Sequence, residues 1–249
     1  MASIPVQTIS RFGLVRQIGR GAQGNVFLAT DPQLGRRVAI KTLTVQSTLA
    51  ADAVARLLKE ARTASSLSHP NLVPVYEAGL HAGRPYVVFE YVEGRTLAEL
   101  LRVDGAMPPA RAVITMSQIL AGVAHAHAKG VLHGDITPSN IIVTPEGVPR
   151  VTDFGISRGV WELAANAPTG TPRYMAPEHF RNLPADLRCD VYALGVIFYE
   201  MLTGQSAVPN GEELSVINRI LNESIPLPSH TNANIDPRLD QIVRRALFR

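Results

Sequence analysis

The stretch VLHGDITPSNIIV (Val131–Val143) and the shorter stretch VTDFG (Val151–Gly155) decide the fold. In them Asp135 and Asn140 stand five residues apart, and Asp153 follows at the distance of a short hairpin. Phosphoryl transfer needs a carboxylate that receives a hydroxyl proton, and oxygen ligands that hold a divalent cation on the phosphates. A chance Asp-Phe-Gly is common, but this order and spacing are not. The two stretches therefore predict a phosphoryl-transfer site.

A glycine-rich stretch lies upstream of them. IGRGAQGNV (Ile18–Val26) contains Gly-x-Gly-x-x-Gly between two predicted strands. A dinucleotide-binding turn would lead from a strand into a helix. The pattern instead favours a hairpin whose backbone closes over phosphates without Cβ atoms in the way. Taken alone, the stretch is equally well explained as an ordinary glycine-rich turn.

A lysine on the next predicted strand fits the same interpretation. In VAIK (Val38–Lys41), strand alternation points Lys41 to the same side as Ala39. Glu60 lies on the amphipathic helix that follows, and a lysine that reaches toward phosphates needs a carboxylate to hold it. Either residue alone is more simply a strand lysine that reaches water or a solvated helix charge.

The first part of the chain, to about Glu93, is predicted to consist of short strands and one helix, and the remainder mainly of helices. The predicted elements of the first part are a hairpin over residues 12–30, a strand over 37–43, a helix over 50–67 and strands over 72–78 and 85–91. This change of pattern predicts an α+β fold with a small β-rich N-lobe, a larger helical C-lobe, and a ligand cleft at their junction.

Three helices of the second part are predicted from caps and periodicity. The first covers residues 108–129, the second covers residues 190–202, and the third begins at residue 236. The second is apolar nearly all round, which indicates a helix buried inside a lobe. Asp236 and Pro237 form a cap and first-turn pair for the third. Its predicted inward-facing residues are Leu239, Ile242, Val243, Ala246 and Leu247.

Two later motifs complete the set. GTPRYMAPE (Gly170–Glu178) is similar to the end of a protein kinase activation segment, and Asp190 with VYALG to the start of the helix that supports the catalytic loop. With the motifs above, the chain resembles the protein kinases over nearly its whole length. The wording of SHPN (Ser68–Asn71) and FEYVEG (Phe89–Gly94) is most similar to bacterial serine/threonine kinases.

The resemblance implies a domain organisation. An N-terminal extension would cover residues 1–11 and a two-lobed kinase domain residues 12–249, with the N-lobe over about 12–92 and the C-lobe over about 93–249. The chain stops inside what resembles the penultimate helix. In the family, the last helix carries an arginine that pairs with the equivalent of Glu178, and this sequence has no such residue. We therefore expect a missing segment or a partner to complete the C-lobe.

The resemblance also implies a role for each matching residue. Lys41, paired with Glu60, would contact the α- and β-phosphates of ATP. Asn140 and Asp153 would hold Mg²⁺, or Mn²⁺ in its place. Asp135 would orient the substrate hydroxyl and accept its proton.

ATP would be enclosed mainly by the N-lobe. Adenine would lie between Val26 and Ala39 on one side and Ile142 on the other, bonded to the backbone of Glu90 and Val92. The further residues expected around ATP are Ile18, Gly19, Gly21, Gly24 and the gating residue Phe89.

Two residues of the catalytic loop depart from the family pattern. Gly134 stands where the family usually has an arginine, so no cation is present there to pair with a phosphorylated activation segment. Thr137 stands where serine/threonine kinases have a lysine that contacts the γ-phosphate. Loss of one such donor costs about 10²-fold or more in rate. Thr169 and Thr171 are candidate autophosphorylation sites, although an exposed threonine is more often a plain loop residue.

Composition restricts the other classes of function. The 249 residues include 46% hydrophobic and 18% charged residues, as expected of a globular protein. Lys plus Arg number 24 against 21 Asp plus Glu, and the charges are scattered, which disfavours nucleic-acid binding. The single cysteine, Cys189, excludes an internal disulfide and suggests the cytoplasm. Met1–Ser10 shows no secretory signal, and the longest apolar stretch, Val191–Tyr199, is too short to span a membrane.

The sequence predicts an ATP-dependent protein serine/threonine kinase that acts on protein hydroxyls, with autophosphorylation. The alternative is an ATP-binding pseudokinase or scaffold with little or no transfer, which Thr137 and the short C-lobe motivate. A kinase of small molecules is a third interpretation. It fits less well, because such enzymes generally lack an activation segment that ends like Thr171–Glu178.

Overall fold

The computed structural model describes residues 7–21, 24–43, 51–154, 172–181, 183–184, 186–209 and 211–248, with only the backbone of 51–53. These residues form two compact units, each of which is described by itself. Of the described residues, 7–68 and 73–93 belong to the first unit, and 69–72, 94–154 and those from 172 onward to the second.

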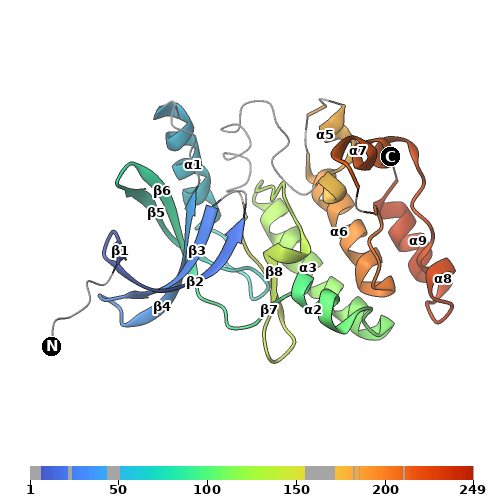
Figure 1. The fold of residues 1–249 in the computed structure, drawn as a ribbon, viewed down its shortest axis with the longest axis horizontal. Helices are drawn as coiled ribbons and strands as arrows, with labels where there is room; N and C mark the ends of the chain where they lie inside the picture. Colours follow the sequence, from blue (N-terminus) through green and yellow to red (C-terminus); the bar gives the residue numbers. More distant parts are fainter. Residues whose placement is uncertain are drawn as a thin grey trace. The chain divides into compact units, whose positions relative to one another are not determined.

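The first unit is a six-stranded antiparallel sheet in the order β1-β2-β3-β4-β6-β5, with one helix beside it (Figure 1). Its elements are β1 (Thr8–Ile9), β2 (Phe12–Gly21), β3 (Gly24–Asp31), β4 (Arg36–Leu43), α1 (Ala51–Ala64), β5 (Val75–His81) and β6 (Arg84–Glu90). The predicted hairpin, third strand and helix are confirmed. Strand β5 begins later than predicted, at Val75, because Leu72 belongs to a turn that packs in the second unit.

Strand alternation divides the core of the first unit between the two sides of the sheet. Val38 and Ile40 of β4 belong to a buried cluster that includes Phe12. Ala39, between them, packs instead against the cluster that α1 covers through Leu57. Since Lys41 is two residues from Ala39, the sheet turns its side chain to the side of α1, as the sequence predicted.

The N-terminal segment takes part in the sheet. Thr8 and Ile9 pair with β2 as strand β1, and Ile9 is buried. The backbone N–H of Ser10 donates to Nδ1 of His81 at 3.0 Å, and Arg11 forms a 2.7 Å ion pair with Glu77. Part of the expected N-terminal extension therefore contributes a strand, and two residues are too few to give that strand a periodic signal.

The second unit is mainly helical and carries a small sheet in the order β7-β8-β9 (Figure 1). Its elements are β7 (Arg95–Thr96), α2 (Leu97–Asp104), α3 (Pro109–Ala128), the 3₁₀ turn η1 (Pro138–Asn140), β8 (Ile141–Val143), β9 (Pro149–Val151), the 3₁₀ turn η2 (Pro172–Tyr174), α5 (Pro177–Phe180), α6 (Leu187–Thr203), α7 (Glu213–Asn222), α8 (Pro228–Thr231) and α9 (Pro237–Ala246). Helix α6 is buried over most of its length, as predicted. It begins earlier than expected because the Asp186 side chain caps it by accepting a 2.8 Å hydrogen bond from the Arg188 backbone.

Helix α9 begins as predicted, with the Asp236 side chain accepting a 2.8 Å bond from the Arg238 backbone. Val243 is buried as expected, but the prediction for Ile242 is wrong, since its side chain is 56% exposed. The buried polar residue Asp240 shares the inner face instead and accepts two hydrogen bonds from Ser229. A carboxylate on the inner face is not visible to a search for apolar periodicity.

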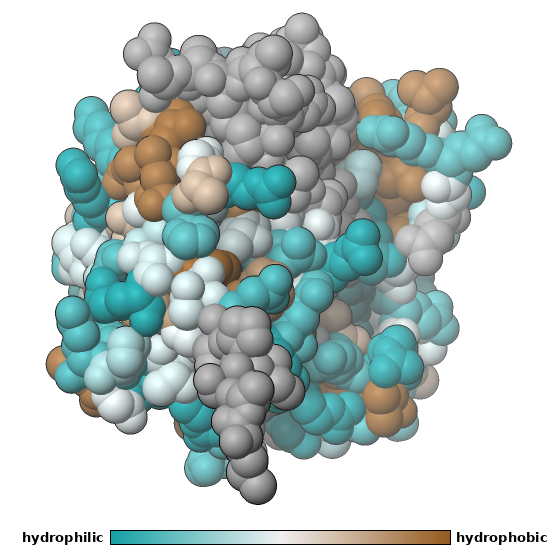
Figure 2. Space-filling model, turned by 60° about the vertical axis from the view of Figure 1, so that its left-hand side comes forward, coloured by the Kyte–Doolittle hydropathy of each residue, from teal (hydrophilic) through white to brown (hydrophobic). Residues whose placement is uncertain are grey.

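The surface in Figure 2 is mostly hydrophilic, with smaller hydrophobic patches between the hydrophilic residues. The large apolar side chains most exposed in the first unit include Val15, Leu34 and Leu80. Scattered exposure of this kind is normal for a globular protein. In the part of the chain that the structure describes, no helix is both long enough and apolar enough to cross a membrane.

Candidate functional site

The glycine-rich motif of the first unit lies at the ends of two paired strands. Strands β2 and β3 remain paired up to Gly21 and Gly24. The Gln17 amide donates to the carbonyl of Gly19 and to the side chain of Asn25, both at 3.1 Å. The Gln17 side chain thus links β2 to the Asn25 side chain of β3 next to the predicted phosphate-binding loop.

Gly24 is the position in this hairpin that most requires glycine. Its φ is +146°, and a Cβ built on it would overlap the carbonyl oxygen of Thr42 on β4. Gly21 has no positive φ, and a Cβ there would meet no described atom within 4 Å. The two glycines of one motif are therefore required to very different degrees.

Replacing Gly24 with alanine is expected to lower the free energy of unfolding by about 1–3 kcal/mol, through a strained φ and displacement of β4. The matched variant Gly21→Ala should change it by less than about 1 kcal/mol. Urea unfolding of both variants measures the difference. Equal losses would show that the strand geometry at Gly24 is not what requires glycine.

The first unit also holds the predicted lysine and its helix partner. Lys41 lies on β4 in register with Val26 of β3 and Val87 of β6, and its side chain is 7% exposed. Glu60 lies in the second half of α1 and is half-buried. Burial of an ammonium group is costly unless it is paired, so a strand lysine with so little exposure differs from an ordinary surface lysine.

The residues expected around adenine range from buried to exposed. Phe89 is buried within the cluster on the α1 side, and Ala39 and Val92 pack against it. The backbone N–H of Glu90 donates to the carbonyl of Pro74 at 3.1 Å. The other expected residues are Val26, half-buried, and Ile18, 37% exposed, in the first unit, and Ile142, half-buried on β8, in the second.

The catalytic loop of the second unit is held by one buried carboxylate, that of Asp190 on α6. Its Oδ2 accepts from the backbone N–H of His133 at 2.9 Å and lies 2.8 Å from Nε2 of His127. Its Oδ1 accepts from the backbone N–H of Gly134 at 2.9 Å. Burial alone would raise the pKa of Asp190, but the hydrogen bonds and the two histidines outweigh burial and lower the pKa. The carboxylate thus stays charged and fixes the loop.

His133 is fully buried behind the loop and is held in one neutral form. Its Nε2 lies 2.9 Å from the carbonyl of Thr152 and donates to it, and its Nδ1 accepts from the backbone N–H of Asp135 at 3.3 Å. Burial lowers the pKa of His133, which agrees with a neutral ring. The ring also contacts Phe154, with centroids 4.6 Å apart. One side chain therefore joins the loop of Asp135 to the segment of Asp153.

Asn140 and Asp135 are brought together as the sequence predicted. The Asn140 side-chain nitrogen donates to the carbonyl of Asp135 at 2.8 Å, which leaves Oδ1 as the side-chain atom able to act as a metal ligand. The backbone N–H of Thr152 donates to the carbonyl of Asn140 at 2.9 Å, next to Asp153. Asp153 has φ +68°, an uncommon value for a residue other than glycine that marks functional sites. The donor set fits a hard divalent cation.

The structure shows the backbone conformation of Gly134 and the burial of Thr137, the two residues that depart from the family pattern. Gly134 adopts φ +79°, which favours glycine, although a Cβ there would meet no described atom within 4 Å. Thr137 is 7% exposed and its carbonyl accepts the backbone N–H of Asn140 at 3.0 Å. The backbone of the loop is therefore maintained without the usual two cations. Thr169 and Thr171 lie outside the described residues.

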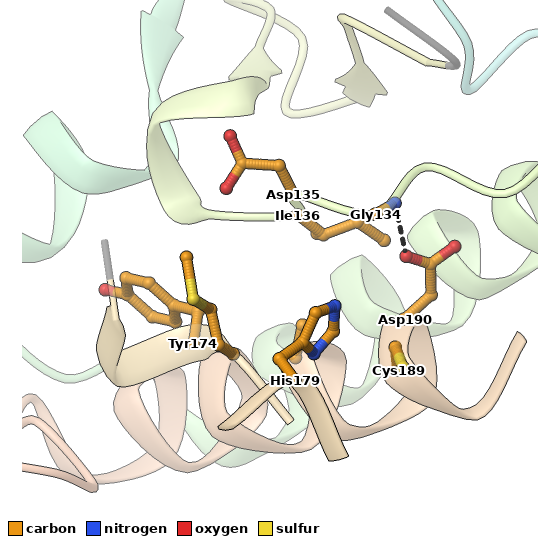
Figure 3. A pocket seen from close by; sticks show the side chains of 9 residues that line it. Gly134, Asp135, Ile136, Tyr174, His179, Cys189 and Asp190 are labelled. Atoms are coloured by element: carbon orange, nitrogen blue, oxygen red, sulfur yellow. Dashed lines mark hydrogen bonds between the residues drawn. The ribbon is translucent and has the colours of Figure 1, made fainter. Parts of the chain in front are cut away.

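A pocket opens beside Asp135 in the second unit (Figure 3). It has an empty volume of about 250 Å³, part of it open to solvent. The loop residues Gly134 to Ile136 form one side, and Tyr174 and His179 stand opposite them, with Cys189 and Asp190 at one end. The pocket also includes Met175 and Ala193, so it joins an apolar wall to the Asp135 carboxylate.

Two contacts that sequence reasoning missed hold this far wall. The Tyr174 hydroxyl donates to Oε2 of Glu200 at 2.8 Å, and burial raises the pKa of both groups. The Cys189 thiol donates to Oε1 of Glu178 at 3.4 Å, and burial raises the pKa of this thiol to about 12. Glu178 therefore has a hydrogen-bond partner among the described residues. Neither contact has a signal in the sequence, because each joins residues on different elements.

Comparisons with known proteins agree with these observations. The protein kinase domain model matches residues 12–247. The chain is 36% identical over 239 residues to serine/threonine-protein kinase PrkC of Bacillus subtilis, covering 95% of this chain and 37% of PrkC. It is 37% identical over 241 residues to PknE of Mycobacterium tuberculosis, covering 95% of this chain and 42% of PknE. The chain thus spans about 40% of the length of such curated relatives.

A solved structure shows the same fold. The crystal structure of the Mycobacterium tuberculosis PknI kinase domain matches with a TM-score of 0.77 and 25% identity, over 100% of this chain and 91% of that one. The predicted α+β kinase fold and the likeness to bacterial serine/threonine kinases are confirmed. Enzymes of this kind use ATP, a divalent metal ion and protein substrates. With its match over nearly the whole length, the chain belongs to the protein kinase domain family.

Proposed function

We propose that this chain is the catalytic domain of a protein serine/threonine kinase, which transfers the γ-phosphate of ATP to protein hydroxyls, itself included. The observation that carries the proposal is the fixed arrangement of the loop of Asp135. Asp190 holds its backbone, Asn140 bonds to it, and a pocket with an apolar wall lies beside it. A carboxylate next to a pocket suits the binding of a side-chain hydroxyl and the acceptance of its proton.

The residues of the first unit would bind the nucleotide. The glycine-rich hairpin that includes Gly24 would cover the phosphates with backbone, and Lys41, held by Glu60, would contact the α- and β-phosphates. The Glu90 carbonyl, whose own N–H is used elsewhere, would accept a hydrogen bond from adenine. The burial of Lys41 and Phe89 supports a site that encloses its ligand.

The residues of the second unit would carry the transfer. Asn140, through Oδ1, and Asp153 would hold Mg²⁺, with phosphate oxygens and water as further ligands. The bound metal would neutralise charge on the phosphates. Asp135 would orient the substrate hydroxyl and take its proton.

The departures in the loop suggest a slower enzyme that needs no phosphorylated activation segment. Gly134 offers no cation to a phosphothreonine, so Asp190 and His133 would keep the loop in place by themselves. Thr137 would leave the γ-phosphate without one positive donor, at a cost of about 10²-fold in rate. Both Thr169 and Thr171 remain candidate autophosphorylation sites, and a location in the cytoplasm remains a prediction.

We also propose that a further segment or a partner completes the C-lobe and supplies a guanidinium that pairs with Glu178. A neutral thiol from Cys189 at 3.4 Å is a weak partner for a half-buried carboxylate, which supports this expectation. The partner would satisfy the remaining charge of Glu178.

The test is transfer of labelled γ-phosphate from ATP, with Mg²⁺ and then Mn²⁺, to the protein itself and to a generic basic protein. Label on the wild type that disappears in Lys41→Met would establish an active kinase. Absence of label from a folded preparation that still binds ATP would contradict the proposal, and the chain would then be a nucleotide-binding scaffold. Transfer to a sugar or an antibiotic but never to protein would contradict the substrate class.

A further inference from the structure

A histidine-based turn in the second unit joins the chain between α1 and β5 to helix α3. Residues His69–Leu72 form a β-turn, in which the Leu72 N–H donates to the carbonyl of His69 at 3.0 Å. The backbone N–H of Asn71 donates to Nδ1 of His69 at 3.1 Å. His69 thus occupies the first position of the turn and bonds to the backbone two residues on, the role that Asp or Asn commonly has there.

The turn is anchored to the second unit by four further contacts. The Asn71 side chain donates to the carbonyl of Pro149 at 2.9 Å, and its carbonyl accepts the backbone N–H of Val151 at 2.9 Å. The Arg150 guanidinium donates to the carbonyl of Leu72 at 2.9 Å. On α3, a Cβ added to Gly122 would lie 3.1 Å from the Asn71 carbonyl, so the turn packs against the helix backbone. These four contacts therefore depend on the turn being closed.

A second histidine faces the first. The rings of His69 and His125 have centroids 5.4 Å apart and are tilted by 36°. Nε2 of His125 is buried and has no hydrogen-bond partner among the described residues. A pair of imidazoles at this separation can be accommodated when both are neutral, whereas two imidazolium rings would repel each other.

Within the described residues, the elements packed against the His69 turn carry basic rather than acidic side chains. Helix α3 contributes His125 and His127, its C-cap is Lys129, and β9 contributes Arg150, whereas neither α3 nor β9 has an Asp or Glu. His127 is directed to Asp190 instead. Burial, and then the neighbouring His125, lower the pKa of His69. Protonation at Nδ1 would also remove the lone pair that accepts the Asn71 N–H, so a charged His69 cannot keep the turn bond.

We propose that the His69–Leu72 turn is a pH-sensitive latch beside His125, closed while the His69 ring is neutral, and that protonation of His69 opens the turn and detaches it from α3 and β9. The direction of the pH dependence follows from the lowered pKa. The contribution of the latch to stability is complete above about pH 6.5, the ordinary value for histidine, and is lost as the pH falls through the lowered value. The proposal does not depend on phosphate transfer.

The latch predicts a local effect that one substitution removes. His69→Asn keeps an acceptor for the Asn71 N–H but does not titrate. Between pH 7.5 and 5.5, the amide protection of Leu72 and Val151, corrected for intrinsic exchange, should fall in the wild type, because a protonated Nδ1 cannot accept the Asn71 N–H. The fall should be clearly smaller in His69→Asn than in the wild type. Hydrogen exchange read by mass spectrometry or NMR measures both.

Two controls separate the latch from general acid sensitivity. The buried, neutral His133 contributes acid sensitivity to every variant, so only the difference from wild type is informative. His230→Asn, on α8, is the matched change away from the turn and should leave the pH effect at Leu72 intact. His125→Gln should raise the pKa of His69, measured by NMR titration. Equal loss of protection in wild type and His69→Asn, or a native His69 pKa at or above the ordinary value, would overturn the proposal.

Discussion

Replacing Asp190 with alanine is expected to lower the free energy of unfolding of this kinase domain by about 3–5 kcal/mol. The carboxylate is 1% exposed and lies within 2.9 Å of nitrogen atoms of His127, His133 and Gly134. Its removal would leave two backbone N–H groups and an imidazole without their acceptor in a buried site. Each unsatisfied group costs about 1–3 kcal/mol. Urea unfolding followed by circular dichroism measures the loss.

Asp186→Ala is the matched control, since it removes a carboxylate from the same helix. Asp186 is half-exposed and caps the first turn, so its loss should cost only about 0.5–2 kcal/mol. Any Asp190→Ala protein that still folds should also lose phosphate transfer, because the loop of Asp135 would no longer be fixed. A loss no larger than that of Asp186→Ala would contradict the central place given to Asp190.

Acid should affect Asp190 in a different pH range from the histidine latch. The pKa of this carboxylate is lowered below its ordinary 3.8, so its contribution to stability is complete above that value and is lost only as the pH falls below it. The pKa values of the neutral histidines His69 and His133 are lowered from 6.5. These histidines therefore lose their contribution to stability at a higher pH than Asp190 does. The two effects can therefore be separated in one pH series.

The local elements of this fold were predictable because their signals are short-range. Apolar spacing predicts α1 and α3, and the Asp236-Pro237 pair predicts the start of α9. Asp135 and Asn140, which the sequence singled out by their spacing, belong to one loop, and the structure joins them by a hydrogen bond. Strand β1 escaped prediction because two residues carry no period, and Ile242 was misplaced because the buried carboxylate of Asp240 displaces the apolar face.

The contacts that fix the site were less predictable, because they join distant parts of the chain. The bond between Tyr174 and Glu200 and the one between Cys189 and Glu178 have no local pattern. The resemblance to kinases placed Asp190 at the start of the buried helix. The hydrogen bonds that its carboxylate accepts are known only from the structure. A family motif thus indicates which residues matter, whereas burial and geometry show how each is held.

Asp135→Asn should reduce phosphate transfer by about 10²–10⁴-fold, the usual contribution of a general base. The amide has nearly the shape of the carboxylate but cannot accept the hydroxyl proton. The bonds that hold the loop use the backbone of residue 135: its N–H donates to His133 and its carbonyl accepts from Asn140. The substitution should therefore leave stability within about 1 kcal/mol and ATP binding unchanged, so the loss falls on the transfer step.

The measurement is the rate of labelled phosphate transfer to protein under saturating ATP, with unfolding and ATP-binding measurements on the same preparations. Ser139→Ala is the matched control, since Ser139 is an exposed neighbour in the same loop and should keep the rate within about twofold. If the wild type transfers phosphate and Asp135→Asn keeps more than about a tenth of that rate, Asp135 is not the base. Transfer would then depend on orientation and on the charge around the phosphates, as the loosely bonded transition state of phosphoryl transfer allows.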